Sequence, residues 1–159
     1  MVRNLNKSRL FARGFTFLEV VIVIAILSII VATVLPPLMN FRKNSTLNSE
    51  VQEVMTLINK ARMSAISSKD DQQFGIHFEA GKVVLFQGVT YTPGAATNEE
   101  HILDAAITGI TTINGGGSEL LFAKIIGSTS QNATTTLLIV GTTASTTILV
   151  RQSGIVTVN

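Results

Sequence analysis

A chain of 159 residues is long enough for one compact domain with an appendage, and too short for two full domains to be expected. Four of its 12 basic residues precede Phe15, which leaves 8 basic against 10 acidic residues from Phe15 onward. This mild acidity argues against nucleic-acid binding, which needs clustered Lys and Arg. The absence of cysteine excludes disulfides, thiolate nucleophiles and cysteine zinc sites.

Residues 1–14 form a basic leader, and the segment 15–35 that follows is apolar at all but four positions. At 1.5 Å per residue, a helix over this segment would measure about 31 Å, close to the roughly 30 Å hydrocarbon core of a bilayer. We therefore predict a transmembrane helix here, with the N-terminus in the cytoplasm because basic residues concentrate on that side. A secretory signal peptide is the alternative, but the apolar segment is too long for one and no A-x-A-like cleavage site follows it.

Glu19 is the one acid in this apolar segment. One interpretation is local, since Thr16 and Glu19 have the spacing of a capping box and a carboxylate in the first turn suits the helix dipole. The other is functional, because a carboxylate inside a membrane is costly and needs a partner, and no Lys, Arg or His lies within 15–35. Cleavage between Gly14 and Phe15 would create an ammonium group one helical turn away. The amine of a neighbouring subunit would then give each Glu19 a defined partner.

Pro36 and Pro37 interrupt the helical ladder, because each lacks an N–H and clashes with the preceding turn, so we expect a kink. Beyond them the segment 36–68 reads as an amphipathic continuation of the helix. Apolar residues recur there at alternating spacings of four and three, with polar residues between them. This stripe consists of Leu47, Val51, Val54, Ile58, Ala61 and Ala65.

Residues 72–159 have the features of a β-domain outside the cytoplasm. "QFGIHF" and "KVVLFQ" flank a turn at 79–81 and predict a hairpin, and "TTLLIVG" and "TTILVRQSGIVTVN" supply β-branched strands with a turn at Ser153-Gly154. The Gly- and Thr-rich segment 88–119 predicts loops with one or two short strands. The expected fold class is α+β: a long N-terminal helix, membrane-spanning in its first half and amphipathic in its second, packed on a small antiparallel sheet domain.

The stretch "RGFTFLEVVIVIAILSIIVATVLPP" resembles the N-terminus of type IV prepilins and type II secretion pseudopilins. The resemblance implies that prepilin peptidase cleaves after Gly14 and that its methyltransferase activity N-methylates Phe15. It implies that Glu19 pairs with the terminus of an adjacent subunit during assembly. Pro36 matches the proline of the family pattern, and Pro37 is an addition to it.

A second resemblance covers the rest of the chain. "INKARMSAIS", "FGIHF", "LLFAKIIGSTS" and "ILVRQSGIVTV" are similar to the GspH/FimT group of minor pseudopilins, with Arg62 as the arginine of an Ala-Arg-x-x-Ala-Ile pattern. The implied partners are other pilin or pseudopilin subunits, prepilin peptidase, membrane lipid before assembly and an inner-membrane assembly platform. The implied destination is a type IV pilus or a type II secretion pseudopilus.

Other candidate sites are weak. His77 and His101 lack metal-ligand spacing and are expected to be solvated polar groups, Asp70-Asp71 reads as a polar turn, and the glycines at 115–117 lack the lysine of a phosphate loop. No nucleophile elbow occurs, so we expect no catalytic residue, metal or cofactor and no enzyme. Two alternatives stay open: an uncleaved, membrane-anchored binding domain, and a DNA-binding minor pilin that would use Arg62 and Arg151.

Overall fold

The computed structural model describes residues 14–159, apart from the side chains of Leu35, Pro36 and Asn40. The predicted leader therefore lies outside the described residues except for Gly14. The chain divides into two units, one ending at Met39 and the other spanning Asn40–Asn159, and each is described by itself. A single helix, α1 (Phe17–Ile66), contributes to both units.

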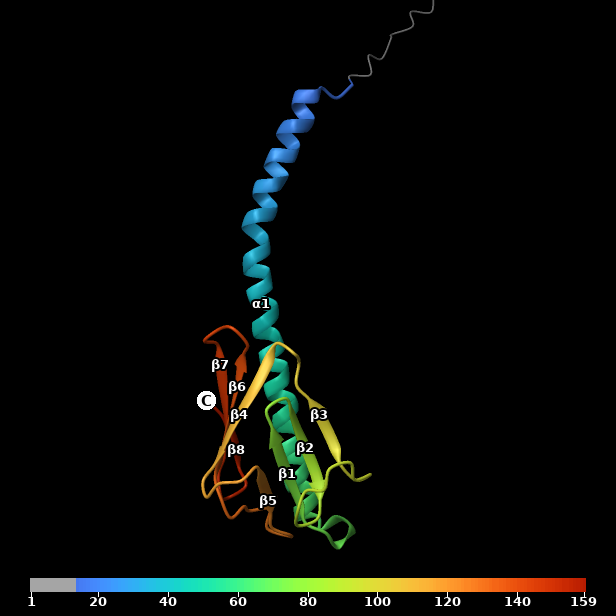
Figure 1. Cartoon of the computed structure of the whole chain (residues 1–159), viewed down its shortest axis with the longest axis vertical. Coiled ribbons are helices and arrows are strands. Elements are labelled where there is room, and N and C mark those ends of the chain that lie inside the picture. Colours follow the sequence, from blue (N-terminus) through green and yellow to red (C-terminus); the bar gives the residue numbers. More distant parts are fainter. Residues whose placement is uncertain (1–13) are drawn as a thin grey trace, which may run out of the picture. The chain divides into compact units, whose positions relative to one another are not determined.

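The strands and one short 3-10 turn all belong to the second unit (Figure 1). The turn, η1, covers Lys69–Asp71. The strands are β1 (Phe74–Glu79), β2 (Lys82–Gln87), β3 (Glu99–Ile102), β4 (Ile107–Ile113), β5 (Glu119–Phe122), β6 (Ala133–Ile139), β7 (Ser145–Val150) and β8 (Val156–Val158).

The helix α1 is continuous through Pro36 and Pro37. A helix can bend at a proline without ending, so the kink stays a prediction. In the second unit the apolar stripe predicted from the sequence is confirmed, because all six of its residues are buried. Leu57 is buried beside them. The small side chains of Ala61 and Ala65 let the helix backbone approach the strands closely at its C-terminal end.

The strands form two antiparallel sheets of four strands each, in the orders β3-β2-β1-β5 and β4-β6-β7-β8. The predicted hairpin is confirmed: Glu79 pairs with Lys82, so Ala80 and Gly81 make a two-residue turn between β1 and β2. The predicted α+β class is also confirmed. The division of the strands between two sheets is an additional feature that the sequence pattern did not predict.

Both sheets and the second half of α1 share one core. Strand β6 shows the expected period of two, with Ala133, Thr135, Leu137 and Ile139 buried and the residues between them half-buried. Where the sequence predicted loops with short strands, the structure has β3 and β4. The three glycines at 115–117 all have positive φ and form part of the loop between β4 and β5.

Candidate assembly site at the N-terminal segment

The start of α1 is shaped by Thr16. Its hydroxyl Oγ1 accepts a hydrogen bond from the backbone N–H of Glu19 at 3.2 Å, and its carbonyl accepts one from Val20 N–H at 3.3 Å. Thr16 is therefore the N-cap, and half of the predicted capping box is present. This bond uses the backbone of Glu19 and leaves its carboxylate free for another role. Glu19 is thus a first-turn acid, where the helix dipole favours negative charge.

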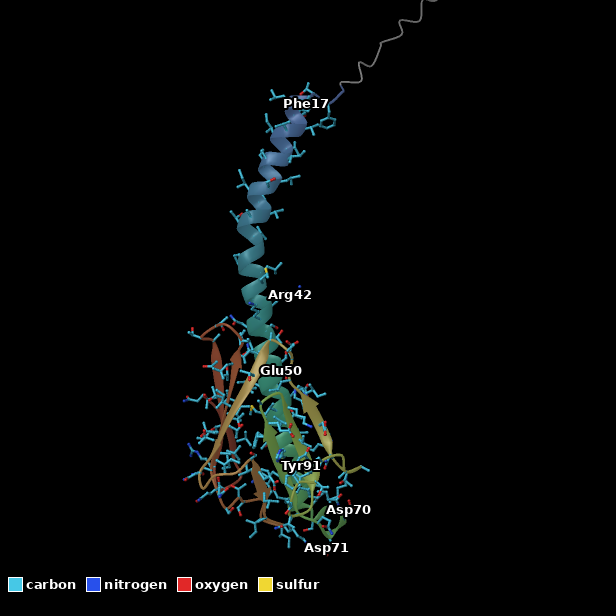
Figure 2. All side chains as sticks on the ribbon, viewed as in Figure 1. Phe17, Arg42, Glu50, Asp70, Asp71 and Tyr91 are labelled. Carbon is cyan, nitrogen blue, oxygen red and sulfur yellow. The ribbon has the colours of Figure 1, made fainter. Side chains whose placement is uncertain are left out.

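The peptide bond between Gly14 and Phe15 precedes the helix and is open. No atom lies within 4 Å of the position that a side chain on Gly14 would occupy, and Phe15 is 80% exposed. Non-helical, accessible backbone is what a peptidase needs in order to bind a chain in extended form. The predicted cleavage position thus lies just outside the helix, while Phe17 marks the helix start (Figure 2).

The first half of α1 exposes its apolar side chains. An 18-residue window there has a mean hydropathy of 3.0, and none of it is buried in the structure, so this helix is long and apolar enough to cross a membrane. Its two internal hydroxyls are satisfied within the helix, since Ser28 Oγ donates to Ile24 O at 2.8 Å and Thr33 Oγ1 donates to Ile30 O at 3.0 Å. Such internal bonds remove the cost of placing hydroxyls among lipid tails or other helices.

Glu19 has no basic neighbour along this segment, because no Lys, Arg or His occurs between Gly14 and Phe41. Within the described residues, the Glu19 carboxylate takes part in neither an ion pair nor a side-chain hydrogen bond. The geometry therefore presents one carboxylate at the start of an apolar helix, one turn from the predicted new terminus. It is suited to receive a cation from another molecule.

The side chain of Arg62 joins α1 to a loop of the second unit. Its Nε donates to the carbonyl of Gly127 at 3.3 Å, which connects the last turns of α1 to the loop after β5. Gly154, in the predicted turn between β7 and β8, packs against the same pair of groups. The Ala-Arg-x-x-Ala-Ile pattern thus places two buried alanines against the sheets and one arginine at the junction of the helix with two loops.

The expectation of solvated histidines is corrected. The side chain of His77 is only 17% exposed and stacks on Tyr91, and His101 Nε2 lies 2.7 Å from Glu50 Oε2, which is 14% exposed. Each histidine thus packs beside a carboxylate that comes from elsewhere in the chain. Over residues 14–159, no three His, Asp or Glu side chains come together as a possible metal site.

Two contacts between α1 and β3 were not predicted from the sequence. Glu50 binds His101, and Lys60 Nζ donates to Glu99 Oε1 at 2.7 Å. The partners are far apart along the chain and follow no local spacing, so only the fold reveals them. Asp71, in the predicted polar turn, binds Lys124, whose hydrogen bond and positive charge lower the pKa of Asp71.

The N-terminal segment matches a known family. Residues 10–35 match the family described as the prokaryotic N-terminal methylation motif. No curated protein sequence is significantly similar to the chain. This match covers the segment that holds the predicted cleavage position and the exposed, apolar part of α1.

Two solved structures share this fold, and both are of minor subunits. The type IV minor pilin FimU of Pseudomonas aeruginosa aligns with a TM-score of 0.57 and 18% identity over 75% of this chain and 92% of FimU. The minor pseudopilin EpsH of the Vibrio cholerae type 2 secretion system aligns with a TM-score of 0.55 and 14% identity over 71% of this chain and 95% of EpsH. The resemblance to minor subunits inferred from the sequence is therefore confirmed at the level of the fold.

Proposed function

We propose that the chain is a structural subunit, a minor pilin or pseudopilin, that is cleaved after Gly14 and assembled through the first half of α1. The observation that carries the proposal is the contrast between the two halves of this helix. The apolar stripe of the second half is buried against the sheets, whereas the first half is exposed as far as Val34 and is apolar apart from Glu19, Ser28 and Thr33. The exposed half coincides with the methylation motif at 10–35.

Assembly would follow from the energetics of this surface. Apolar helices that leave lipid for a filament core lose little burial, so the transfer itself has a small free-energy cost. The Glu19 carboxylate would meet the N-methylated amine of Phe15 on an adjacent subunit, in surroundings of low dielectric constant. A pair of this kind costs desolvation of both charges, so we expect it to fix the register between helices more than to add strength.

The remaining partners follow from the same proposal. Prepilin peptidase with its methyltransferase activity would process the chain in the cytoplasmic membrane, and an inner-membrane platform would then extract it. The β-domain would stay outside the cytoplasm, and the protein would act without catalysis of its own. We propose no DNA-binding role, because Arg62 is engaged with Gly127 and Arg151 has no basic neighbour in sequence.

Intact-mass spectrometry of the purified protein tests processing directly. The chain would be produced in a host with prepilin peptidase, in parallel with a Gly14→Val variant that blocks the cleavage position. We expect the native chain to begin at Phe15 and to carry one methyl group, and the variant to begin at Met1. A native chain that keeps its leader would support the alternative of an uncleaved, membrane-anchored binding domain.

A further inference from the structure

His77 lies at the centre of a polar cluster on the sheet formed by β3, β2, β1 and β5. Its ring stacks on that of Tyr91, with centroids 4.0 Å apart and planes 18° from parallel. Its Nε2 lies 3.5 Å from Glu79 Oε1, and its Nδ1 lies 3.7 Å from Glu119 Oε1. Nδ1 is buried and has no hydrogen-bond partner in the structure. Each ring nitrogen therefore faces a different carboxylate.

This arrangement suits an imidazolium better than an imidazole. A neutral imidazole carries one N–H, so one of its nitrogens would direct a lone pair at a carboxylate. The protonated ring carries an N–H on both nitrogens, and each would then have an acceptor close by. A positive ring stacked on a tyrosine also gains a cation–π contribution that the neutral ring lacks.

The surrounding charges come from several elements. Glu79 on β1 and Glu119 on β5 face the ring, while Val84, its partner on β2, is apolar. Lys82 on β2 lies 3.7 Å from Glu79 and 3.5 Å from Glu100 on β3. Burial acts to lower the pKa of Lys82, but these carboxylates outweigh it and raise that pKa. The one lysine is thus shared between two acids, and Glu119 has no basic partner other than His77 among the described residues.

The cluster also holds a connecting segment. Tyr91 lies in residues 88–98, between β2 and β3, and its backbone N–H donates to Glu119 Oε2 at 3.4 Å. Glu119 therefore contacts both His77 and the backbone of Tyr91, whose ring also packs near Phe86. In Figure 2 Tyr91 is labelled on the β-domain. The stacking of Tyr91 on His77, its packing near Phe86 and its backbone hydrogen bond to Glu119 thus hold this segment against the sheet.

We propose that protonation of His77 clamps the segment 88–98 onto the sheet and that deprotonation loosens it. In the protonated state the ring bridges Glu79 and Glu119 and attracts the Tyr91 ring. In the neutral state the stacking remains, but one ring nitrogen opposes a carboxylate. The surface that this segment presents is therefore better ordered in acid than at alkaline pH. Histidine is the side chain that ordinarily changes charge in the physiological range.

The composition of the chain allows a specific test. Tyr91 is the one tyrosine, tryptophan is absent and there are two histidines, so tyrosine fluorescence reports on the neighbour of His77. We would titrate the full chain in detergent micelles from about pH 8 to about pH 5, alongside His77→Gln and the matched control His101→Gln. Because an imidazolium quenches an adjacent phenol, we expect a loss of fluorescence in the native chain and in the control, and none in His77→Gln.

A nitroxide label tests the clamp itself. The chain has no cysteine, so Val89→Cys, at a position that is 66% exposed, places one label within the segment. On acidification we expect the label's spectrum to broaden in the native background and to stay constant in His77→Gln. His77→Phe keeps an aromatic ring on Tyr91 but cannot titrate, so the spectrum of the label in this variant should also be independent of pH. Circular dichroism would verify that each variant is folded. The proposal would be overturned if the mobility of the label in the native background did not change with pH. It would also be overturned if the label in His77→Gln lost mobility on acidification as it does in the native background.

Discussion

Gly154 offers a sharp test of how the end of α1 joins the β-domain. The residue has φ 78, in the region that favours glycine. A Cβ built on it would lie 1.9 Å from the carbonyl oxygen of Gly127 and 2.7 Å from Arg62 Nε. Ala at this position must therefore displace backbone, and it would break the hydrogen bond between Arg62 and Gly127.

The expected cost of Gly154→Ala combines these effects. A left-handed backbone costs a residue with a side chain about 1–2 kcal/mol, and the lost hydrogen bond costs about 1 kcal/mol. Displacement of Gly127 adds to both, so the free energy of unfolding should fall by about 2–3 kcal/mol or more. For a domain of this size, that corresponds to a fall in melting temperature of roughly 10 °C.

The matched control is Gly141→Ala. Gly141 has almost the same φ, 77, but no atom lies within 4 Å of its built Cβ. Only the backbone cost of about 1–2 kcal/mol should remain. Thermal and urea unfolding of the full chain in detergent, followed by far-UV circular dichroism, would measure both variants. Equal losses at the two glycines would refute the close packing of Gly154 against Gly127 and Arg62.

Three further predictions concern stability. Ile125 has φ 68 and is 73% exposed, so Ile125→Gly should raise the free energy of unfolding by up to about 1 kcal/mol. Ile126→Gly, at a neighbour without positive φ, should lower the free energy of unfolding. A lower free energy of unfolding in both variants would contradict the strained turn. Ile58 is fully buried, so Ile58→Ala should cost about 2–5 kcal/mol in urea unfolding, and a cost under about 1 kcal/mol would mean that α1 does not pack on the sheets as described. Lys124 lowers the pKa of Asp71, so this pair stabilises the fold above the unfolded-state pKa of aspartate and ceases to do so as the pH falls through the lowered value. Asp71→Asn should therefore be less stable than the native chain at neutral pH and low salt and equal to it in acid, and a difference that ignores pH would exclude this pairing.

Local patterns predicted the local structure well. The stripe from Leu47 to Ala65 follows the helical period, and the hairpin at Ala80-Gly81 and the turn at Gly154 each follow from adjacent residues. Each signal arises within a few residues, where backbone geometry fixes which side chains share a face.

The long-range arrangement could not be predicted in this way. The pairing of β1 with β5, which completes one sheet and leaves the remaining strands to the other, depends on contacts between distant segments. The same holds for the contacts of Glu50 with His101 and of His77 with Tyr91. At the N-terminus, the lone acid of an apolar segment and a family resemblance together identified Gly14, Phe15 and Glu19, and the structure adds the Thr16 cap and the exposure of the segment. The roles of these three residues stay predictions.

The central claim is that the Glu19 carboxylate binds the terminus of an adjacent subunit. Glu19→Ala tests it most directly, because the Thr16 cap uses the backbone N–H of residue 19 and survives the substitution. The measurement is the amount of variant in sheared filaments or pseudopili relative to the amount in the membrane, in a host that supplies the assembly machinery. We predict normal membrane insertion and normal cleavage with loss of incorporation, whereas incorporation equal to that of the native chain would contradict the claim.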